Sequence, residues 1–145
     1  MTELLHRETS RCIIQAFHQV YAELGTGFLE SVYAAALVHS LRQQAIEVER
    51  EVPVTVYFRG YAIGVFRVDV LVERKVAVEL KAVRVIDPSH EAQLLNYLRA
   101  TDLEVGLLLN FGPKAEVRRF AFSNERKLLA RAQAGSQCGL DANGR

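Results

Sequence analysis

The chain has 145 residues, of which 50% are hydrophobic and 24% charged, and its formal net charge is +1. This length and composition suit a single core, so we expect one domain over residues 1–133. No segment approaches the about 18 uncharged apolar residues of a membrane-spanning helix, and the N-terminus lacks a signal-peptide pattern. Its two cysteines give neither a disulfide framework nor a zinc spacing. These features predict a soluble cytoplasmic protein without a membrane partner.

Hydrophobic periodicity predicts the elements in chain order. A period near 3.6 indicates helices, and a period of two indicates strands. Asp87-Pro88 is typical of a helix start, with an N-cap followed by proline. The expected elements are helices over residues 5–24 and 29–44, strands over 48–58, 61–72 and 76–83, a helix over 88–100, and strands over 105–110 and 117–122. The order predicts an α/β fold in which an antiparallel meander leads into a helical crossover. Residues 134–145 are expected to be a disordered tail.

The third predicted strand carries two charges in an apolar setting. Strand alternation places Glu79 and Lys81 on one face and Val78 and Leu80 on the other. Asp69 is flanked in the same way by apolar neighbours on the preceding strand. Ionised groups at such positions usually indicate a partner, a metal or a ligand, although charge pairs on a hydrated face are the common alternative.

The register of the hairpin between these strands decides whether the two carboxylates meet. A three-residue loop at Glu73-Arg74-Lys75 sets Asp69 opposite Glu79 and Arg67 opposite Lys81. A two-residue loop would send the carboxylates to opposite faces. In the first case, a cation between them would relieve their repulsion, and such oxygen ligands suit Mg²⁺. Lys81 would then orient a nucleophilic water or neutralise the scissile phosphate.

With these surroundings the chain resembles the PD-(D/E)XK nuclease superfamily, whose core of helix, three-strand meander, helix and strand matches residues 29–110. Asp69 and Glu79-Leu80-Lys81 fit its signature, although Val68 stands where a proline is expected. Within it, the chain is more similar to the GxxExxY family, whose motif reads Gly27-Phe28-Leu29-Glu30-Ser31-Val32-Tyr33. The resemblance implies a restriction-endonuclease-like fold over roughly residues 5–122. It also implies a metal site that uses Asp69, Glu79 and the main-chain carbonyl of Leu80.

The first of the two flanking helices offers two further candidates. Glu30 lies in its first turn, where a carboxylate is favoured by exposed N–H groups. The resemblance implies that Glu30 completes the metal site as a third acidic ligand. Tyr33 shares the face of Glu30 and would support Glu30, contact a phosphate or pack, and we favour packing.

A polar stripe on the next helix consists of His90, Gln93 and Tyr97. The spacing of Gln93 and Tyr97 resembles a motif of the RecB-like branch of the superfamily, in which the glutamine reaches the site. Gln93 is therefore a catalytic candidate. The other two are candidates for substrate binding or support, as is Arg67, although any amphipathic helix needs a polar face.

Two classes of function fit this pattern. The first is a nuclease that hydrolyses phosphodiester bonds with Mg²⁺, which Mn²⁺ can replace, and acts on DNA in preference to RNA. The second is a nuclease-fold module with little turnover that binds nucleic acid or a protein partner in a defence, repair or mobile-element system. The near-neutral charge favours the second somewhat. A homodimer is compatible with either class.

Overall fold

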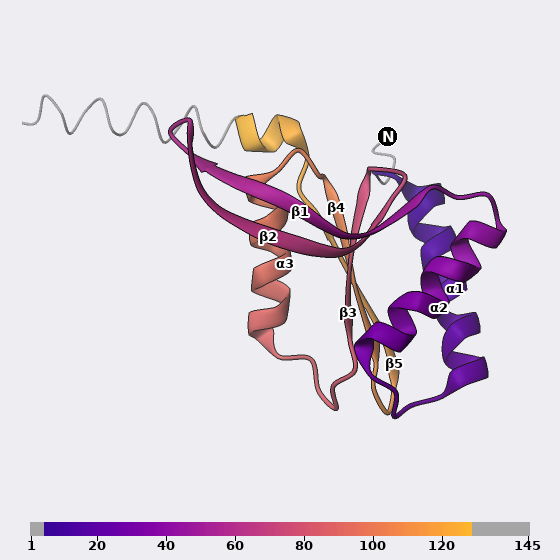
Figure 1. Cartoon of the computed structure of the whole chain (residues 1–145). Helices are drawn as coiled ribbons and strands as arrows, with labels where there is room; N and C mark the ends of the chain where they lie inside the picture. The colour runs from indigo at the N-terminus through magenta and orange to yellow at the C-terminus, as the bar shows by residue number, and fades with distance from the viewer. Residues whose placement is uncertain (1–4, 129–145) are drawn as a thin grey trace, which may run out of the picture.

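The structure, a computed structural model, describes residues 5–128, so the predicted tail at 134–145 lies outside the described residues. A five-stranded sheet in the order β1-β2-β3-β4-β5 forms its centre. Helices α1 and α2 lie on one side of the sheet and α3 on the other (Figure 1). The elements are α1 (Arg7–Leu24), α2 (Glu30–Gln43), β1 (Val48–Phe58), β2 (Tyr61–Val72), β3 (Val76–Lys81), α3 (Pro88–Ala100), β4 (Val105–Phe111) and β5 (Ala115–Ala121). No helix within this part of the chain is long and apolar enough to cross a bilayer.

The predicted order of elements and the mixed α/β class are confirmed. Strands β1, β2 and β3 form the antiparallel meander, and α3 carries the chain to β4, which pairs with β3 in parallel. Strand β3 ends at Lys81, two residues before the predicted end. The side chain of Asn110 explains this, because its amide accepts the Val83 N–H at 3.0 Å and donates to the Val83 carbonyl at 2.9 Å. Side-chain hydrogen bonds thus replace a strand ladder there.

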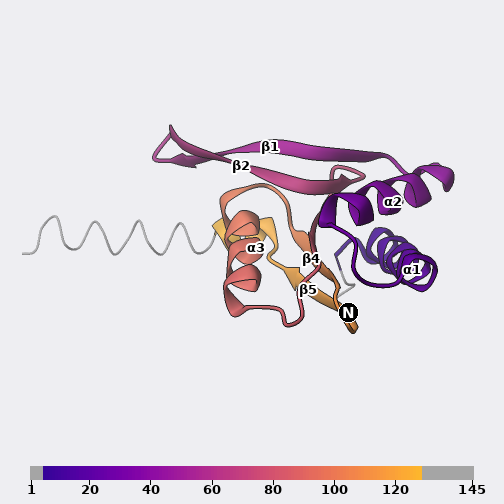
Figure 2. The same ribbon diagram turned by 60° about the horizontal axis from the view of Figure 1, so that its bottom comes forward.

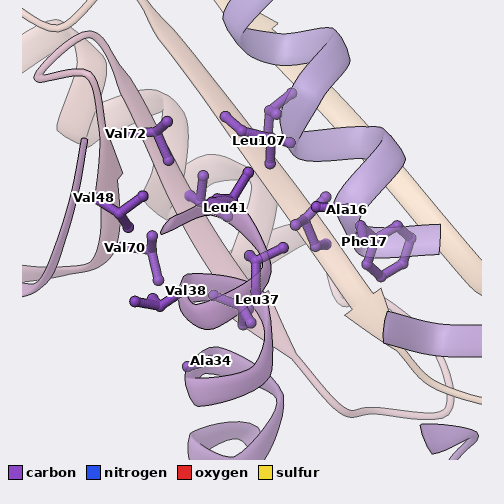
Figure 3. Packing of buried hydrophobic residues seen from close by; sticks show 14 of the residues in the cluster. Ala16, Phe17, Ala34, Leu37, Val38, Leu41, Val48, Val70, Val72 and Leu107 are labelled. Carbon is purple, nitrogen blue, oxygen red and sulfur yellow. The ribbon is translucent and has the colours of Figure 1, made fainter. Parts of the chain in front are cut away.

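The main core lies between the sheet and the pair α1 and α2. Figure 3 shows Leu37 and Leu41 of α2 and Phe17 of α1 among Val72 and Leu107 of the sheet. The opposite face packs against α3 in a smaller cluster built from Leu94, Leu71, Ala77, Leu108 and Val68. Strand β4 is buried along its whole length, as expected for a strand covered on both faces.

The loop between α1 and α2 is fastened by Tyr33. Its ring is fully buried and stacks on Phe111 with centroids 4.1 Å apart. Its hydroxyl donates to the Gly25 carbonyl at 2.6 Å and accepts the Phe28 N–H at 3.2 Å. Gly25 and Gly27 have φ values of 67° and 104°, which favour glycine. Packing, the interpretation favoured from the sequence, is therefore the arrangement found for Tyr33.

Near Asp69, the side chains of β2 on either side of it point to opposite faces of the sheet. Val68 packs in the cluster under α3, whereas Val70 packs in the main core on the other side of the sheet. Two such residues in a regular strand would share a face, as we expected. Glu51, on the neighbouring strand, has a φ of 51°, and the regular pairing is interrupted between Arg50↔Val70 and Val52↔Val68. Beyond this point the β1–β2 hairpin extends past the body of the molecule (Figure 2).

A buried lysine holds the C-terminal end of the described chain against α3. The Lys127 side chain is 5% exposed, and its ammonium donates to the carbonyls of Thr101 and Leu103 at 2.8 and 2.6 Å. It also donates to Asn124 Oδ1 at 3.0 Å. Carbonyl groups that follow the end of α3 thereby receive a charged donor.

Candidate active site

The register that the carboxylates require is present. Val72 pairs with Val76 and Val70 with Val78, so the loop is the three-residue Glu73-Arg74-Lys75. Glu73 and Arg74 have φ values of 54° and 55°, and the Lys75 N–H donates to the Val72 carbonyl at 3.0 Å. Continued by one step, this register brings Asp69 to the level of Glu79.

Asp69 meets β3 through its side chain. The backbone ladder between β2 and β3 runs only to Val70 and Val78. Beyond it, Asp69 Oδ2 accepts the Leu80 N–H at 3.0 Å. The N–H and C=O of one strand residue point to the same edge, so the Leu80 carbonyl is also directed toward Asp69.

The surroundings of Glu79 disfavour the charged form of its carboxyl group. Its side chain is only 15% exposed. Burial, followed by the nearby charge of Asp69, raises the pKa of Glu79 to about 8, and Lys81 opposes that rise. The charge of Glu30 adds a smaller increase. Without a cation, the site therefore favours the protonated form of Glu79 more than water does for an ordinary glutamate.

Lys81 supplies the positive charge of the site. Its Nζ lies 4.0 Å from Glu79 Oε1, and its side chain is 18% exposed. Ala77 packs in the cluster under α3, so alternation places Glu79 and Lys81 on that same face. This confirms the side-chain directions expected for β3.

A hollow of about 190 Å³ opens beside Asp69 and Leu80. Glu30, at the start of α2, lines it together with Arg50 and Glu51 of β1. Glu30 is exposed, and its charge reaches Glu79. Within residues 5–128, however, no group of three His, Cys, Asp or Glu side chains is arranged to hold a metal ion. Glu30 therefore does not join Asp69 and Glu79 in a ready-made set of three ligands.

The donors that do converge suit a hard divalent cation. The Glu79 carboxyl lies near Asp69 where burial disfavours its charge, and strand geometry directs the Leu80 carbonyl to the same edge as the Leu80 N–H that Asp69 accepts. A cation between them would offset the repulsion that raises the pKa of Glu79. Mg²⁺ is commonly held by one or two carboxylates with water completing its coordination. Asp69, Glu79 and the Leu80 carbonyl fit that pattern without a third acid.

Of the three residues in the polar stripe on α3, Tyr97 is the one on which the charges of Glu79 and Asp69 act. Burial, and then the charges of Glu79 and Asp69, raise the pKa of Tyr97, and its ring stacks on Phe66 of β2 at 3.7 Å. Gln93 is exposed and donates its amide to the Tyr97 hydroxyl. Gln93 thus has a link to the site through Tyr97.

Two other candidates lie outside the site. His90 Nδ1 accepts the Asp87 N–H at 3.3 Å, which closes the capping box at the start of α3. Arg67 was expected opposite Lys81, but the pairing of β2 with β3 ends at Val70, so Arg67 pairs with Pro53 of β1 and with no residue of β3. Its side chain is 72% exposed and lies 3.9 Å from Glu51. The expected position of Arg67 is wrong because the hairpin leaves β3 at Asp69.

Sequence reasoning missed Arg50 and Asn110. Arg50 lines the hollow, whereas Asn110 fixes the backbone just after Lys81 and is fully buried. A polar residue at the end of the apolar run from Val105 was a usable signal for Asn110, because buried amides need partners. Arg50 gave no such signal, since surface arginines are common.

Comparison with known proteins shows the family of this chain. A family model described as the PD-(D/E)XK nuclease superfamily matches residues 7–120. Among solved structures, the chain is similar to one titled "Crystal structure of SSO0001", with 18% identity and a TM-score of 0.49. The match covers 86% of this chain and 66% of that one, so this chain spans slightly less than two thirds of its length. No curated protein matches. Because the family model covers most of its length, the chain belongs to the PD-(D/E)XK nuclease superfamily.

Proposed function

We propose that the chain is a metal-dependent nuclease that hydrolyses phosphodiester bonds, with DNA favoured over RNA. The observation that supports this proposal most is the carboxylate pair of Asp69 and Glu79, with Lys81 on the same face of β3 as the partly buried Glu79. PD-(D/E)XK nucleases generally use divalent metals, and we infer Mg²⁺ here, with Mn²⁺ as a substitute. The motif from Gly27 to Tyr33 supports a place in the GxxExxY family.

Asp69, Glu79 and the Leu80 carbonyl would hold the cation. Glu79 must give up its proton to do so, and the Asp69 carboxylate is kept in position by the Leu80 N–H. Glu30, across the hollow, would take part through an intervening water. When bound, a divalent cation there would polarise the phosphodiester and favour ionisation of water at neutral pH.

The basic side chains would contact the phosphate and neutralise its charge. The ammonium of Lys81 would neutralise charge on the scissile group or orient the attacking water. Arg50 is the arginine that lines the hollow, so we assign it the phosphate contact considered for Arg67. Tyr97 would position the Gln93 amide beside the site.

The test is a cleavage assay on linear, nicked, branched and single-stranded DNA and on RNA, with Mg²⁺, with Mn²⁺ or with EDTA. Asp69→Asn and Lys81→Met should each lower turnover by about 100-fold or more. Asp102→Asn, at an exposed aspartate away from the hollow, is the matched control and should keep activity. Cleavage that survives in both site variants would refute the assignment.

The second candidate function is a binding module with little turnover. The observation that favours it is the lack of a ready-made group of three acidic ligands within residues 5–128. It predicts retention of nucleic acid in EDTA with no product on any substrate when metal is supplied. Arg50→Ala should then weaken retention, whereas Arg67→Ala, which alters an exposed arginine outside the hollow, should not.

A further inference from the structure

A pocket of about 470 Å³ lies between α1 and the last strand, β5, outside the site described above. Its lining consists of Arg7, Ser10, Arg11, Ile14 and Gln15 of α1 and Arg119 of β5. The helical residues recur at spacings of three and four, so they share one face of α1. Pockets that bind small molecules usually have volumes of about 300–1,000 Å³, so this pocket is large enough for a small organic ligand.

The pocket lies on the opposite face of the sheet from Glu79 and Lys81. Val117 of β5 packs against the main core, and alternation places Arg119 on that same face. The Arg119 guanidinium donates from Nη2 to the Leu5 carbonyl at 2.8 Å, just before α1 begins. Glu79 and Lys81 point to the face that α3 covers, and α1 and α3 lie on opposite sides of the sheet (Figure 1). A ligand in this pocket is therefore separate from a phosphate held at the proposed active site.

The charge of the pocket is positive. Three guanidinium groups line it, and no acidic side chain of the described chain does. Arg11 pairs with Glu8 at 3.0 Å, but within residues 5–128 neither Arg7 nor Arg119 forms an ion pair. The N-cap residue of α1, His6, makes no side-chain hydrogen bond to the first turn, whose N–H groups carry partial positive charge. Arg7 is the first residue of α1, where the helix dipole disfavours a cation unless an anion is near.

The buried hydroxyl of Ser10 points to a ligand independently of these charges. Ser10 lines the pocket although it is only 4% exposed. Within residues 5–128, its Oγ is the one buried side-chain oxygen or nitrogen that has no hydrogen-bond partner. Buried hydroxyl groups normally have a partner, and an unsatisfied one costs free energy. An anion in the pocket would accept this hydroxyl and supply the partner.

The charge count favours a phosphate monoester over other anions. A monoester carries about −1.5 to −2 charges at neutral pH, which matches the guanidinium groups of Arg7 and Arg119. A carboxylate, or one diester of a nucleic-acid backbone, carries a single negative charge. Guanidinium groups also donate to phosphate oxygens in pairs. The side chain of Ile14 and the aliphatic stems of the arginines give an attached organic group an apolar surface.

We propose that the pocket between α1 and β5 binds a phosphate monoester that is attached to an organic group, through Arg7, Arg119 and the hydroxyl of Ser10. This inference goes beyond the proposed nuclease activity and does not depend on it. A free mononucleotide and the 5′-phosphate of a DNA strand both present this chemistry, and the experiment distinguishes them.

Calorimetric titration of the full chain with adenosine monophosphate (AMP), in EDTA and about 50 mM salt, tests the site. AMP should bind at one site and more tightly than inorganic phosphate or adenosine, because it carries both the dianion and the attached group. Arg7→Gln and Arg119→Gln should each weaken binding by about tenfold or more, because a charged hydrogen bond is lost. Arg59→Gln, at an exposed arginine in the β1–β2 turn, is the matched control and should bind AMP like wild type.

Ser10→Ala separates a ligand contact from a structural role. Without ligand, this variant should melt no lower than wild type, because it removes a buried hydroxyl that has no partner in the described chain. It should also bind AMP more weakly, by about threefold or more. A loss of stability with unchanged AMP binding would instead assign the hydroxyl to the fold. Arg7→Gln, at an exposed residue, keeps the test valid if Arg119→Gln, which also loses its bond to Leu5, does not fold.

A single-stranded oligonucleotide with a 5′-phosphate, and its unphosphorylated copy, identify the source of the monoester. Displacement of AMP by the phosphorylated strand alone would support a strand end as the ligand, and displacement by neither would support a free nucleotide. Equal displacement by both strands would assign the pocket to the nucleic-acid backbone and overturn the proposal. So would AMP binding that is no tighter than adenosine binding, that is absent up to about 5 mM, or that is unchanged in the Arg7 and Arg119 variants.

Discussion

The carboxylate of Asp69 accepts the backbone N–H of Leu80 at 3.0 Å, just where the ladder between β2 and β3 ends. One side chain therefore completes the sheet and also places a negative charge beside Glu79. These two roles can be separated by substitution, because the hydrogen bond requires an oxygen and the electrostatic effect requires a charge.

Asp69→Asn should keep the fold, since its amide oxygen can still accept the Leu80 N–H. Asp69→Ala should lower the free energy of unfolding by about 1–3 kcal/mol, because a partly buried N–H would lose its acceptor. Urea denaturation of the two variants beside wild type measures the difference. Equal losses in both would show that the hydrogen bond contributes nothing to stability.

Glu79→Gln should stabilise the metal-free protein in a pH-dependent manner. The folded pKa of about 8 lies above the ordinary 4.5, so the folded state binds the proton more tightly than the unfolded state does. Stability of the wild type then falls as pH rises from 4.5 to 8, and a glutamine removes that loss. We expect a gain that is absent near pH 4.5, grows as the pH rises toward 8 and is complete above it.

Thermal melts across that pH range, in EDTA, measure this gain. Glu23→Gln, at an exposed glutamate, is the matched control and should show no such trend. A gain for Glu79→Gln that is the same at every pH would contradict the raised pKa.

Binding of Mg²⁺ should release a proton at neutral pH, because Glu79 must ionise to become a ligand. Affinity should therefore fall as pH decreases below about 8. Calorimetric titration in two buffers with different ionisation enthalpies counts the protons released. Glu79→Gln should bind weakly and release none, and equal proton release from this variant would place the metal elsewhere.

Tyr33→Phe should lower stability by about 1–3 kcal/mol, because it leaves the Gly25 carbonyl and the Phe28 N–H without their partner. Tyr61→Phe removes a hydroxyl from a ring that is 78% exposed, and it should have little effect. Chemical denaturation compares the two. If Tyr33→Phe instead abolished cleavage at full stability, the hydroxyl would have a role in catalysis.

The sequence predicted the sheet and the central charges well because both follow short-range rules. The loop at Glu73-Arg74-Lys75 sets the register, and alternation sets the face of Glu79 and Lys81. The position of Arg67 could not be predicted in this way. It depends on where the hairpin leaves the sheet, which is marked by the left-handed backbone of Glu51 on another strand.

The helical candidates were predicted less evenly. The polar stripe of α3 was correctly placed, but spacing cannot show that His90 caps its own helix while Tyr97 approaches the carboxylates. Glu30 was correctly placed in the first turn of α2. Its distance from the other acids depends on how α2 packs across the sheet, and no local pattern encodes that.

The amide of Asn110 that fastens Val83 also bears on the order in which the protein folds during synthesis. Val83 and Asn110 lie 27 positions apart. Asp69, Glu79 and Lys81 therefore emerge from the ribosome well before the strand that must lie beside them. Until α3 has formed and β4 has docked in parallel, the segment after Lys81 has no partner for its backbone. A nascent chain paused before Asn110 would hold every acidic residue of the site and still lack the site itself.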